Sequence, residues 1–377
     1  MRQQDSNDSI AVPVTWVRKG RGAVSNLAHR FESVVRQGDA DAAEAERLNG
    51  EGFPFDDDVL PALATTTALE TARSLITYNE SPDIGFDRSI NPYRGCEHGC
   101  IYCFARPTHS YLNLSPGLDF ETKLVAKRNA VELLEQELAA TGYKPQVIAL
   151  GVITDAYQPI ERDLKLTRGV VEILTRTRHP FGLITKSSLI ERDIDLLAPA
   201  AADGLVGATI SITTLQHSLS RILEPRAASP TRRLRTVRAL ATAGIPVTVN
   251  VAPIIPFINE PEIEHVLQAA AEAGAWQAHY TVLRLPWEVA PLFMQWLEAH
   301  FPDRKERVMN RMRDMRGGKN YDSQFGTRMT GEGTWAALIR QRFEKAAAKL
   351  GLDRHVPPLR NDLFDAPRLA TPQLDLF

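Results

Sequence analysis

A regular alternation of mainly apolar runs and helical segments constrains the fold of this chain more than any other feature. The apolar runs occupy residues 147–153, 181–185, 205–212, 246–252 and 278–283. Helical spacing marks the segments between them, at residues 129–140, 162–177, 190–197, 229–243 and 260–273. Apolar strands that alternate with helices are typical of parallel βαβ units covered on both faces. We therefore predict an α/β fold, either a barrel or a doubly wound sheet, with residues 119–127 as a further strand.

The composition of the chain divides it into three parts. Residues 1–81 are predicted to form a partly disordered N-terminal extension, with a charged helix at 36–49 and a loop at 50–58. Residues 82–300 carry the alternation and form the predicted core domain. Residues 301–377 are predicted to form a C-terminal helical extension and tail.

All three cysteines of the chain lie within eight positions of one another, at Cys96, Cys100 and Cys103. The C-x3-C-x2-C spacing includes glycines at 95 and 99, which let a short loop fold around one inorganic group. Thiolates are soft ligands suited to an iron–sulfur cluster, and a [4Fe-4S] cluster ordinarily takes four of them. Because the sequence holds no fourth cysteine, one iron would be open to a small molecule.

A structural zinc site is the main alternative for the cysteine loop. His98 or His109 would complete a Cys3His ligand set, which is common in closed tetrahedral sites. The chain would then be a structural zinc or iron–sulfur binding protein with a regulatory or nucleic-acid-binding role. Anaerobic analysis for iron and sulfide distinguishes the two kinds of site.

Polar side chains appear abruptly where the apolar runs end. Thr154 and Asp155 follow the run at 147–153, Lys186 follows 181–185, and Ser211 lies at the end of the next run. The carboxyl ends of parallel strands meet on one side of such a fold, and ligands bind there. The sequence therefore predicts a ligand site beside the cysteine loop.

The cysteine loop and these strand ends resemble the radical S-adenosylmethionine (radical SAM) superfamily. More narrowly, they resemble its spore photoproduct lyase-related branch, as an uncharacterised bacterial subfamily. The resemblance covers roughly residues 82–300 and rests on residues 91–96, 154–161, 184–187, 211–213 and 223–234.

The resemblance implies that the α/β fold is a partial (β/α)6 TIM-like barrel. It also implies an enzyme whose cofactors are a [4Fe-4S] cluster and S-adenosyl-L-methionine (SAM). SAM would chelate the open iron, and an electron donor such as flavodoxin or ferredoxin would reduce the cluster. Reductive cleavage of SAM would yield a 5′-deoxyadenosyl radical, which removes hydrogen from a substrate. The protein would supply binding, geometry and exclusion of competing reactions.

The resemblance also implies roles for particular residues. Lys186 would bind the methionine carboxylate of SAM, while Ser211 and Thr154 would offer hydroxyls to its amino, carboxylate or ribose groups. Asp155 would accept from the amino group or the ribose. Each has a plainer alternative: a surface charge for Lys186, helix caps for the hydroxyls and a turn former for Asp155.

Three further residues are candidates for cofactor binding. Tyr102 and Phe104 flank Cys103, and an aromatic beside the cluster would lie along the adenine of SAM. Arg226 would reach an anionic group of cofactor or substrate. Core packing for Tyr102 and an exposed helix end for Arg226 are the competing interpretations.

The substrate is weakly specified by the sequence. The lyase resemblance and two arginine-rich stretches, at 221–238 and 304–319, suggest a nucleic-acid-related substrate, although solvated helix faces explain such stretches equally well. In the lyase a further cysteine donates hydrogen, and this chain has none. Tyr157, Tyr280 and Tyr321 are candidates to relay hydrogen, but nothing selects a catalytic residue among them.

The sequence favours a cytoplasmic protein without a membrane partner. Its apolar runs are too short and too interrupted to span a bilayer, and its first residues lack the apolar core of a secretory signal. A net charge of −2 gives no general attraction to nucleic acid or anionic lipid.

Overall fold

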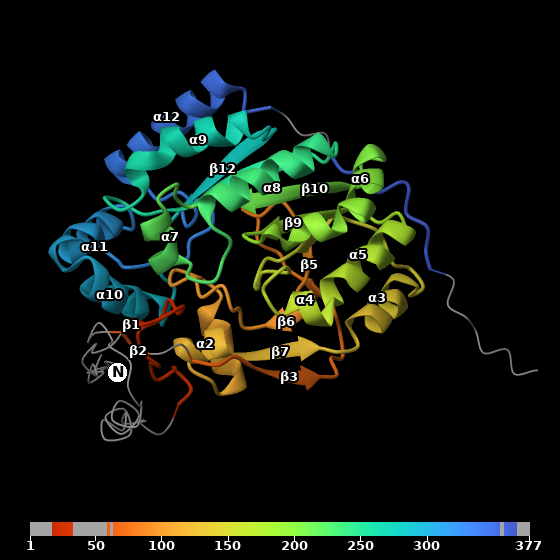
Figure 1. The fold of residues 1–377 in the computed structure, drawn as a ribbon, viewed down its shortest axis with the longest axis horizontal. Coiled ribbons are helices and arrows are strands. Elements are labelled where there is room, and N and C mark those ends of the chain that lie inside the picture. The colour runs from red at the N-terminus through yellow and green to blue at the C-terminus, as the bar shows by residue number, and fades with distance from the viewer. Residues whose placement is uncertain (1–16, 33–58, 61–62, 355–357, 368–377) are drawn as a thin grey trace, which may run out of the picture.

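A computed structural model describes residues 17–32, 59–60, 63–354 and 358–367 (Figure 1). The segments expected as a helix at 36–49 and a loop at 50–58 lie outside the described residues. The main sheet has seven strands in the order β12-β11-β10-β9-β8-β5-β4. Their bounds are β4 Ile76–Tyr78, β5 Arg88–Ile90, β8 Ile148–Leu150, β9 Phe181–Thr185, β10 Val206–Ser211, β11 Val247–Ile254 and β12 Gln277–Val282.

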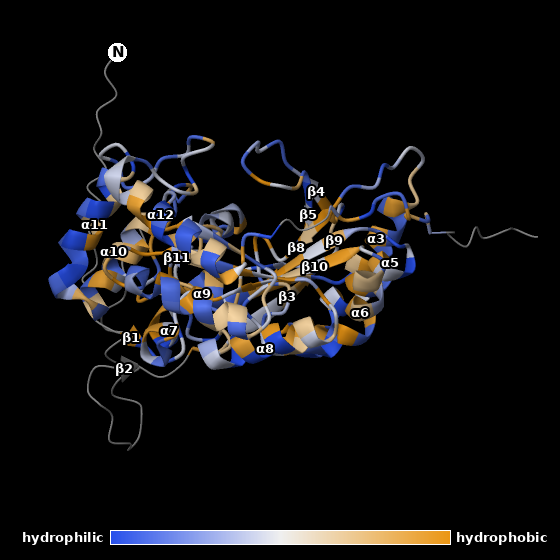
Figure 2. Cartoon of the chain, turned by 90° about the horizontal axis from the view of Figure 1, so that it is seen from above, coloured by the Kyte–Doolittle hydropathy of each residue, from blue (hydrophilic) through white to orange (hydrophobic). Residues whose placement is uncertain are grey.

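Six of these strands, β5 and β8 to β12, are parallel to one another, which confirms the predicted partial (β/α)6 architecture. β4 pairs antiparallel with β5, and β4 and β12 are the two ends of the order. The strands form an apolar interior, and the helices around them turn hydrophilic faces outward (Figure 2). The carboxyl ends of the six strands therefore provide one shared edge for a site.

The helices have these bounds: α2 Leu118–Thr122, α3 Ala130–Leu138, α4 Glu161–Leu164, α5 Leu166–Arg176, α6 Ile194–Ala202, α7 His217–Leu223, α8 Pro230–Thr242, α9 Ile263–Glu272, α10 Val289–His300, α11 Lys305–Asp314 and α12 Gly333–Leu350. Four 3-10 helices join them: η1 Arg106–Leu112, η2 Ser188–Asp193, η3 Glu260–Glu262 and η4 Pro302–Arg304. The helix predicted at 162–177 is interrupted at Lys165, which has a φ of 53°. α12 runs alongside α9 on the outside of the barrel (Figure 1).

The prediction of a strand at 119–127 is wrong for its first residues, and the part that is a strand does not belong to the main sheet. Its first residues form α2, whose buried side chains include both polar and apolar residues. Only Lys123–Lys127 is a strand, β7, and it belongs to a separate sheet in the order β3-β7-β6, with β3 Thr66–Glu70 and β6 Tyr93–Arg94. The first barrel strand is instead β5, which is too short and too polar to give an apolar run.

Part of the region before residue 82 is built into the fold. β4 lies in the main sheet, β3 pairs parallel with β7, and β1 (Val17–Arg18) pairs parallel with β2 (Val59–Leu60). Residues 21–26 contact α2 and the turn before it through hydrogen bonds. The three-stranded sheet and α2 lie below the barrel in Figure 1.

The C-terminal part of the chain covers the edge of β12. The amide of Val282 donates to the carbonyl of Met329 at 2.8 Å, and the amide of Ala278 donates to that of Leu352 at 2.9 Å. Arg328 then forms two hydrogen bonds, of 2.7 and 2.5 Å, with Asp83 in the connection between β4 and β5. This ion pair links segments attached to the two ends of the main sheet, and the edge of β12 is not left open for pairing.

Among the described helices, none is both long and apolar enough to cross a membrane.

Candidate functional site

The cysteine loop follows β6 and lies across the carboxyl ends of the barrel strands. Cys96 and Cys100 are buried and Cys103 is half-buried, and all three are free thiols. The amide of Cys96 donates to the carbonyl of Phe120 at 2.9 Å, and the amide of Cys103 donates to that of Cys100 at 3.2 Å. Three thiols on one fixed loop are a donor set that fits an iron–sulfur cluster.

Arg106 holds the cysteine loop in shape from within the protein. Its fully buried guanidinium group donates to the carbonyls of Cys100 (2.9 Å), Gly99 (3.2 Å) and Gly117 (2.9 Å), and it forms an ion pair with the buried Glu121. Because a buried charge is costly unless it is paired and hydrogen-bonded, this arrangement fixes both partners. Sequence reasoning missed both residues, since charge alone gives no sign of burial.

The N-terminal segment packs directly on the cysteine loop. A Cβ atom at Gly22 would lie 1.8 Å from the carbonyl oxygen of Gly99, so only glycine fits this approach. The amides of Gly22 and Ala23 donate to the Glu121 carboxylate at 3.0 and 2.8 Å. Gly99 itself has a φ of 66°, in the region that favours glycine. Residues 17–32 are thus part of the wall around the site.

Gln158 attaches the other side of the loop to the barrel. Its side-chain oxygen accepts from the amide of Glu97 at 2.9 Å, and its side-chain nitrogen donates to the carbonyl of Gly95 at 3.2 Å. Glu97 also forms an ion pair with Arg226 at 3.0 Å. Arg226 is therefore already engaged by the loop, which the sequence did not predict.

The environment of Cys96 and Cys100 favours the protonated thiol when no metal is bound. Burial raises the pKa of the Cys96 thiol, and the charge of Asp155 adds to that effect. Burial likewise raises the pKa of Cys100 to about 12, against the opposing influence of Lys186. Metal binding at such thiols releases protons, because the ligand is the thiolate.

Asp155 and Lys186 meet at the end of β9. The Asp155 carboxylate accepts from the Thr185 hydroxyl at 2.6 Å and from the Lys186 amide at 2.7 Å, and it lies 3.2 Å from His98 Nδ1. Burial opposes ionisation, but His98, Thr185 and the Lys186 amide hold the pKa of Asp155 well below its usual range. Its oxygens are thus fully used within the protein.

The Lys186 ammonium group is half-buried and has no fixed anionic partner. Its nitrogen lies 5.8 Å from the centroid of the Tyr102 ring. No ion pair or side-chain hydrogen bond holds it among the residues that the structure describes. Burial alone would lower the pKa of Lys186, but its interactions with Cys100 and with the Glu224 carboxylate raise it. A cation in this state can accept the carboxylate of a ligand.

A buried network lies beneath Lys186. Tyr102 donates its hydroxyl to Glu224, which also accepts from Thr213 at 2.5 Å and forms an ion pair with Arg233. Arg233 in turn donates to the carbonyl of Ser211 at 3.1 Å. Tyr102 is thus a packed, hydrogen-bonded residue, and Glu224 and Arg233 are site residues that the sequence did not reveal. Arg233 is one of several arginines in the stretch 221–238, and the sequence gives no sign that it is the buried one.

The remaining predicted residues occupy different positions around the site. Ser211 is buried at the end of β10, while the Thr154 hydroxyl donates to the carbonyl of Tyr93 at 3.2 Å. Phe104 is 39% exposed, and Arg284 lies over its ring at 5.3 Å. The structure therefore brings Asp155, Lys186 and Ser211 to neighbouring strand ends and Tyr102 of the cysteine loop next to Lys186, and it turns Phe104 toward solvent.

The two histidines of the zinc alternative have other contacts. His98 lies against Asp155, and His109 Nε2 lies 2.9 Å from the carbonyl of Lys123. In the part of the chain that the structure describes, no three His, Cys, Asp or Glu side chains are grouped as ligands of one metal ion. Cysteines that hold a [4Fe-4S] cluster each bind a different iron, so they need not converge on one point.

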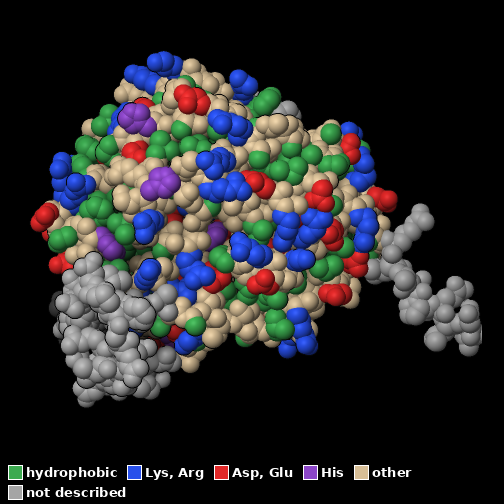
Figure 3. All heavy atoms as spheres, viewed as in Figure 1, with side chains coloured by type: hydrophobic (Ala, Val, Ile, Leu, Met, Phe, Trp, Pro, Cys, Tyr) green, Lys and Arg blue, Asp and Glu red, His purple; other side chains and the backbone are tan. Residues whose placement is uncertain are grey.

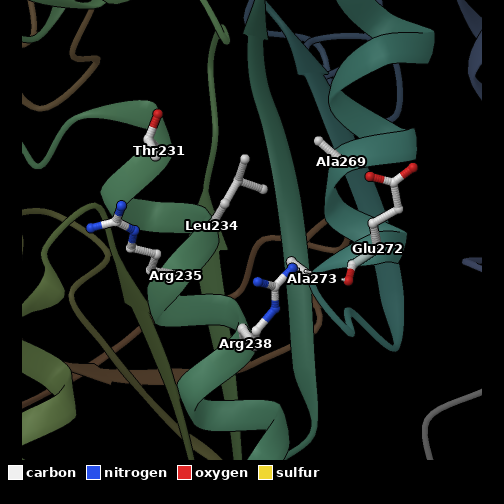
Figure 4. Close-up of a pocket in the computed structure, with 7 residues that line it drawn as sticks. All are labelled: Thr231, Leu234, Arg235, Arg238, Ala269, Glu272 and Ala273. Carbon is white, nitrogen blue, oxygen red and sulfur yellow. Dashed lines mark hydrogen bonds between the residues drawn. The ribbon is translucent and has the colours of Figure 1, made fainter.

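Two cavities lie near the helices that follow β9 and β10. The larger, of about 240 Å³, lies between α8 and α9 away from the site and is lined by Thr231, Leu234, Arg235, Arg238, Ala269, Glu272 and Ala273 (Figure 4). The smaller, of about 180 Å³, adjoins the cysteine loop through His98 and Arg226 and is also lined by Arg162, Ser187 and Ser188.

The arginine-rich stretches are largely committed to contacts within the protein. Arg226, Arg232 and Arg233 pair with Glu97, Glu191 and Glu224. In the second stretch, Arg311 pairs with Asp314, and the buried Arg316 donates to backbone carbonyls. Figure 3 shows Lys and Arg side chains across the face that α5 and α8 cover, with Asp and Glu among them.

Comparison with known proteins identifies the family. The family model of the radical SAM superfamily matches residues 90–270. An uncharacterised protein of Mycobacterium tuberculosis is 33% identical over 280 residues, which are 70% of this chain and 82% of that protein. An uncharacterised protein of Methanocaldococcus jannaschii is 27% identical over 222 residues, 59% of this chain and 79% of that protein.

Solved structures of spore photoproduct lyase variants share the fold. One aligns with a TM-score of 0.51 and 16% identity over 76% of this chain and 80% of its own. Another aligns with a TM-score of 0.50 and 14% identity over 86% of each chain. These findings do not favour the zinc alternative. The chain belongs to the radical SAM superfamily and is an enzyme, and this membership implies a [4Fe-4S] cluster and SAM as its cofactors.

Proposed function

We propose that this enzyme holds a [4Fe-4S] cluster through Cys96, Cys100 and Cys103 and cleaves SAM reductively to remove hydrogen from a substrate. One observation carries the proposal: the loop of free thiols lies beside Lys186, a half-buried ammonium group without an anionic partner. When bound, the reduced cluster supplies the electron that SAM cleavage requires, and the chain supplies the binding groups.

In this proposal Lys186 binds the methionine carboxylate of SAM. A charge-assisted hydrogen bond to a carboxylate suits a lysine that is already charged and partly desolvated. Ser211, at the end of the adjacent strand β10, offers a hydroxyl to the same ligand. Asp155 acts as a positioning residue, since its oxygens already hold Thr185 and the Lys186 amide.

The remaining predicted cofactor contacts have less support. Tyr102 supports Lys186 through its ring and through Glu224, and Thr154 is tied to the backbone of Tyr93. Phe104 is exposed beside Cys103, where an aromatic face can pack against a ligand ring. We propose that Phe104 contacts substrate or adenine and that Tyr102 and Thr154 shape the pocket.

We further propose an acidic electron donor, such as flavodoxin or ferredoxin, for reduction of the cluster. The cavity of about 180 Å³ beside the cysteine loop is lined by Arg162 and Arg226. Positive side chains next to the loop favour docking of a negatively charged protein and make its rate depend on ionic strength.

A nucleic-acid-related substrate remains our proposal for the substrate class. Its support is the shared fold with spore photoproduct lyase, which has been solved with bound AdoMet and a dinucleoside spore photoproduct at a TM-score of 0.50 to this chain. The paired arginines described above add little to it. Affinity for DNA and RNA at two salt concentrations tests it, because phosphate contacts weaken as salt rises; affinity that is absent or insensitive to salt contradicts it.

Anaerobic reconstitution tests the core of the proposal. We expect about four irons and four sulfides per chain, an electron paramagnetic resonance signal after reduction, and 5′-deoxyadenosine from SAM. Cys100→Ala should lose all three, whereas Ser74→Ala, a small change at an exposed position, should lose none. A wild-type protein that binds iron, is reduced and yet forms no 5′-deoxyadenosine contradicts the proposal.

A further inference from the structure

Arg284 lies beside the cysteine loop but takes part in none of the contacts proposed above. It follows β12, at the carboxyl end of the barrel strands. Its guanidinium carbon lies 5.3 Å from the ring centroid of Phe104, the residue after Cys103, and 5.9 Å from that of Tyr321. Two aromatic rings therefore hold this cation next to the site.

Arg284 differs from other arginines of the protein that are equally removed from solvent. Five of those pair with carboxylates: Arg106 with Glu121, Arg192 with Glu161, Arg233 with Glu224, Arg328 with Asp83 and Arg342 with Glu260. The half-buried Arg284 forms no ion pair with any described residue. It donates only to the Tyr321 hydroxyl at 3.1 Å and to the Met329 sulfur, a weak acceptor, at 3.4 Å.

A second unpaired cation lies near Arg284. The buried Arg316 donates to the carbonyls of Thr327 at 2.9 Å and Leu283 at 3.0 Å. Burial lowers the pKa of Arg316, and the charge of Arg284 lowers it further. Asp322 acts in the opposite direction but forms no ion pair with either arginine. In both guanidinium groups the buried Nε lacks a hydrogen-bond partner.

The half-buried guanidinium group of Arg284 carries a positive charge that no carboxylate of the described residues neutralises. A bound anion would neutralise it. A guanidinium group binds phosphate or carboxylate through two parallel hydrogen bonds. The two terminal nitrogens of Arg284 each carry a second hydrogen beyond the one given to Met329 or Tyr321, so both can donate to such an anion. The Tyr321 hydroxyl accepts from Arg284, so its own hydrogen is free to donate to the same anion. Phe104, whose ring lies against the Arg284 guanidinium group, is 39% exposed to solvent.

We propose that Arg284 and Tyr321 bind an oxyanion of the substrate, a phosphate or a carboxylate, and that Phe104 packs against the substrate beside it. This assignment rests on the proposed function, since it places the substrate next to the cluster loop. It identifies the substrate as an anionic molecule. Phosphate-containing and carboxylate-containing probes distinguish the two kinds of oxyanion.

Binding to the reconstituted enzyme with SAM present tests the proposal. The probes are thymidine 5′-monophosphate, thymidine, inorganic phosphate and acetate, titrated calorimetrically under anaerobic conditions. We expect one oxyanion class to bind, with at least tenfold weaker affinity in Arg284→Gln and a smaller loss in Arg284→Lys. A preference for phosphate over acetate assigns a phosphate ester, and the reverse assigns a carboxylate. Thymidine, which lacks an oxyanion, should bind equally to wild type and variant.

Arg235→Gln is the matched control, because it removes the same charge from an exposed position on α8. It should leave every affinity unchanged. Iron content, measured on each sample, shows whether the cysteine loop is intact. Wild-type enzyme that binds none of the oxyanions, or Arg284→Gln that binds them as tightly as wild type, overturns the proposal. If instead no 5′-deoxyadenosine forms but oxyanion binding depends on Arg284, the proposed function fails and the anion site stands.

Discussion

The charged residues around the site are of two kinds. Some hold the site together through contacts within the protein, and others have no charged partner in the protein and are available to bind a ligand. Arg106, Arg233 and Asp155 each have their polar atoms satisfied inside the protein. Lys186 and Arg284 do not, and both face the cysteine loop or its neighbours. This contrast, more than residue type, identifies the ligand-binding residues.

Substitution of Lys186 by methionine should weaken SAM binding selectively. A hydrogen bond to a charged group contributes about 1.5–3 kcal/mol, so we expect a loss of affinity of roughly 10- to 100-fold for SAM. Iron content should remain that of wild type, because Lys186 does not hold the loop. Equilibrium dialysis with labelled SAM measures the effect, with the exposed Lys349→Met as control. Equal affinity for SAM in the two variants would show that Lys186 does not bind SAM.

His179 should make stability depend on pH. It is buried, with Nε2 2.8 Å from the Tyr143 hydroxyl and Nδ1 2.9 Å from the carbonyl of Pro180. Burial lowers its pKa from 6.5 to about 4. The unfolded chain therefore binds a proton more readily than the folded protein between these values, and stability falls as the pH falls through this range.

Urea denaturation at pH 7 and pH 5 checks this prediction. The free energy of unfolding of the wild type should fall between pH 7 and pH 5. In His179→Gln, whose side chain cannot take up a proton, this fall should be smaller by about 2 kcal/mol. The exposed His265→Gln should lose as much as wild type. A loss in His179→Gln as large as that of wild type would show that His179 is not the group that titrates.

Sequence reasoning found the residues whose chemistry shows in their type and spacing. The cysteine triad and the strand-end Lys186 stand out because no ordinary core position requires them. Glu224 and Arg233 were missed, since their importance comes from burial next to each other, which depends on how α8 packs against β10. The exposed Phe104 and the engaged Arg226 likewise depend on tertiary contacts.

Among the strands and helices, the buried strands were predictable from the sequence and the partly polar ones were not. β8 to β12 follow apolar runs, but β5 (Arg88–Ile90) contains arginine and serine and is a strand because its neighbours provide the ladder. α2 contains buried acidic residues that accept hydrogen bonds from the N-terminal segment. Its sequence therefore lacks the apolar face that usually predicts a helix. The division of the chain at residues 81 and 300 stays a prediction.

Gly22→Ala should disturb the cysteine loop from a different segment of the chain. The added methyl would lie 1.8 Å from the Gly99 carbonyl oxygen, so residues 17–32 must move. Overpacking of this kind costs about 1–3 kcal/mol, and part of it should appear as iron lost during gel filtration. Gly85→Ala is the control, because nothing lies within 4 Å of its added methyl. Equal iron retention in both variants contradicts the role of this contact.

Across the fold, Asp83 and Arg328 connect the two ends of the main sheet. Hydrogen bonds from Arg328 lower the pKa of Asp83. The stabilisation is therefore present above the pKa of an unfolded aspartate and is lost as the pH falls through the lower, folded value. The connection should persist at neutral pH.

Asp83→Asn should loosen this connection. Loss of the charge-assisted hydrogen bonds should cost about 1–3 kcal/mol and speed hydrogen exchange in residues 324–331 and 79–87. The exposed Asp303→Asn serves as control. Exchange mass spectrometry at neutral pH measures both, and unchanged exchange in Asp83→Asn would show that other contacts hold the ends together.

The junction between Asp83 and Arg328 has a consequence for how the main sheet opens. β4 and β12 are not paired with each other, so the barrel wall at this place is joined through side chains and not through a strand ladder. Parting it would leave every strand pairing of the sheet intact. The two ends of the main sheet are therefore able to move apart at this place for the loss of the contacts of Asp83 alone.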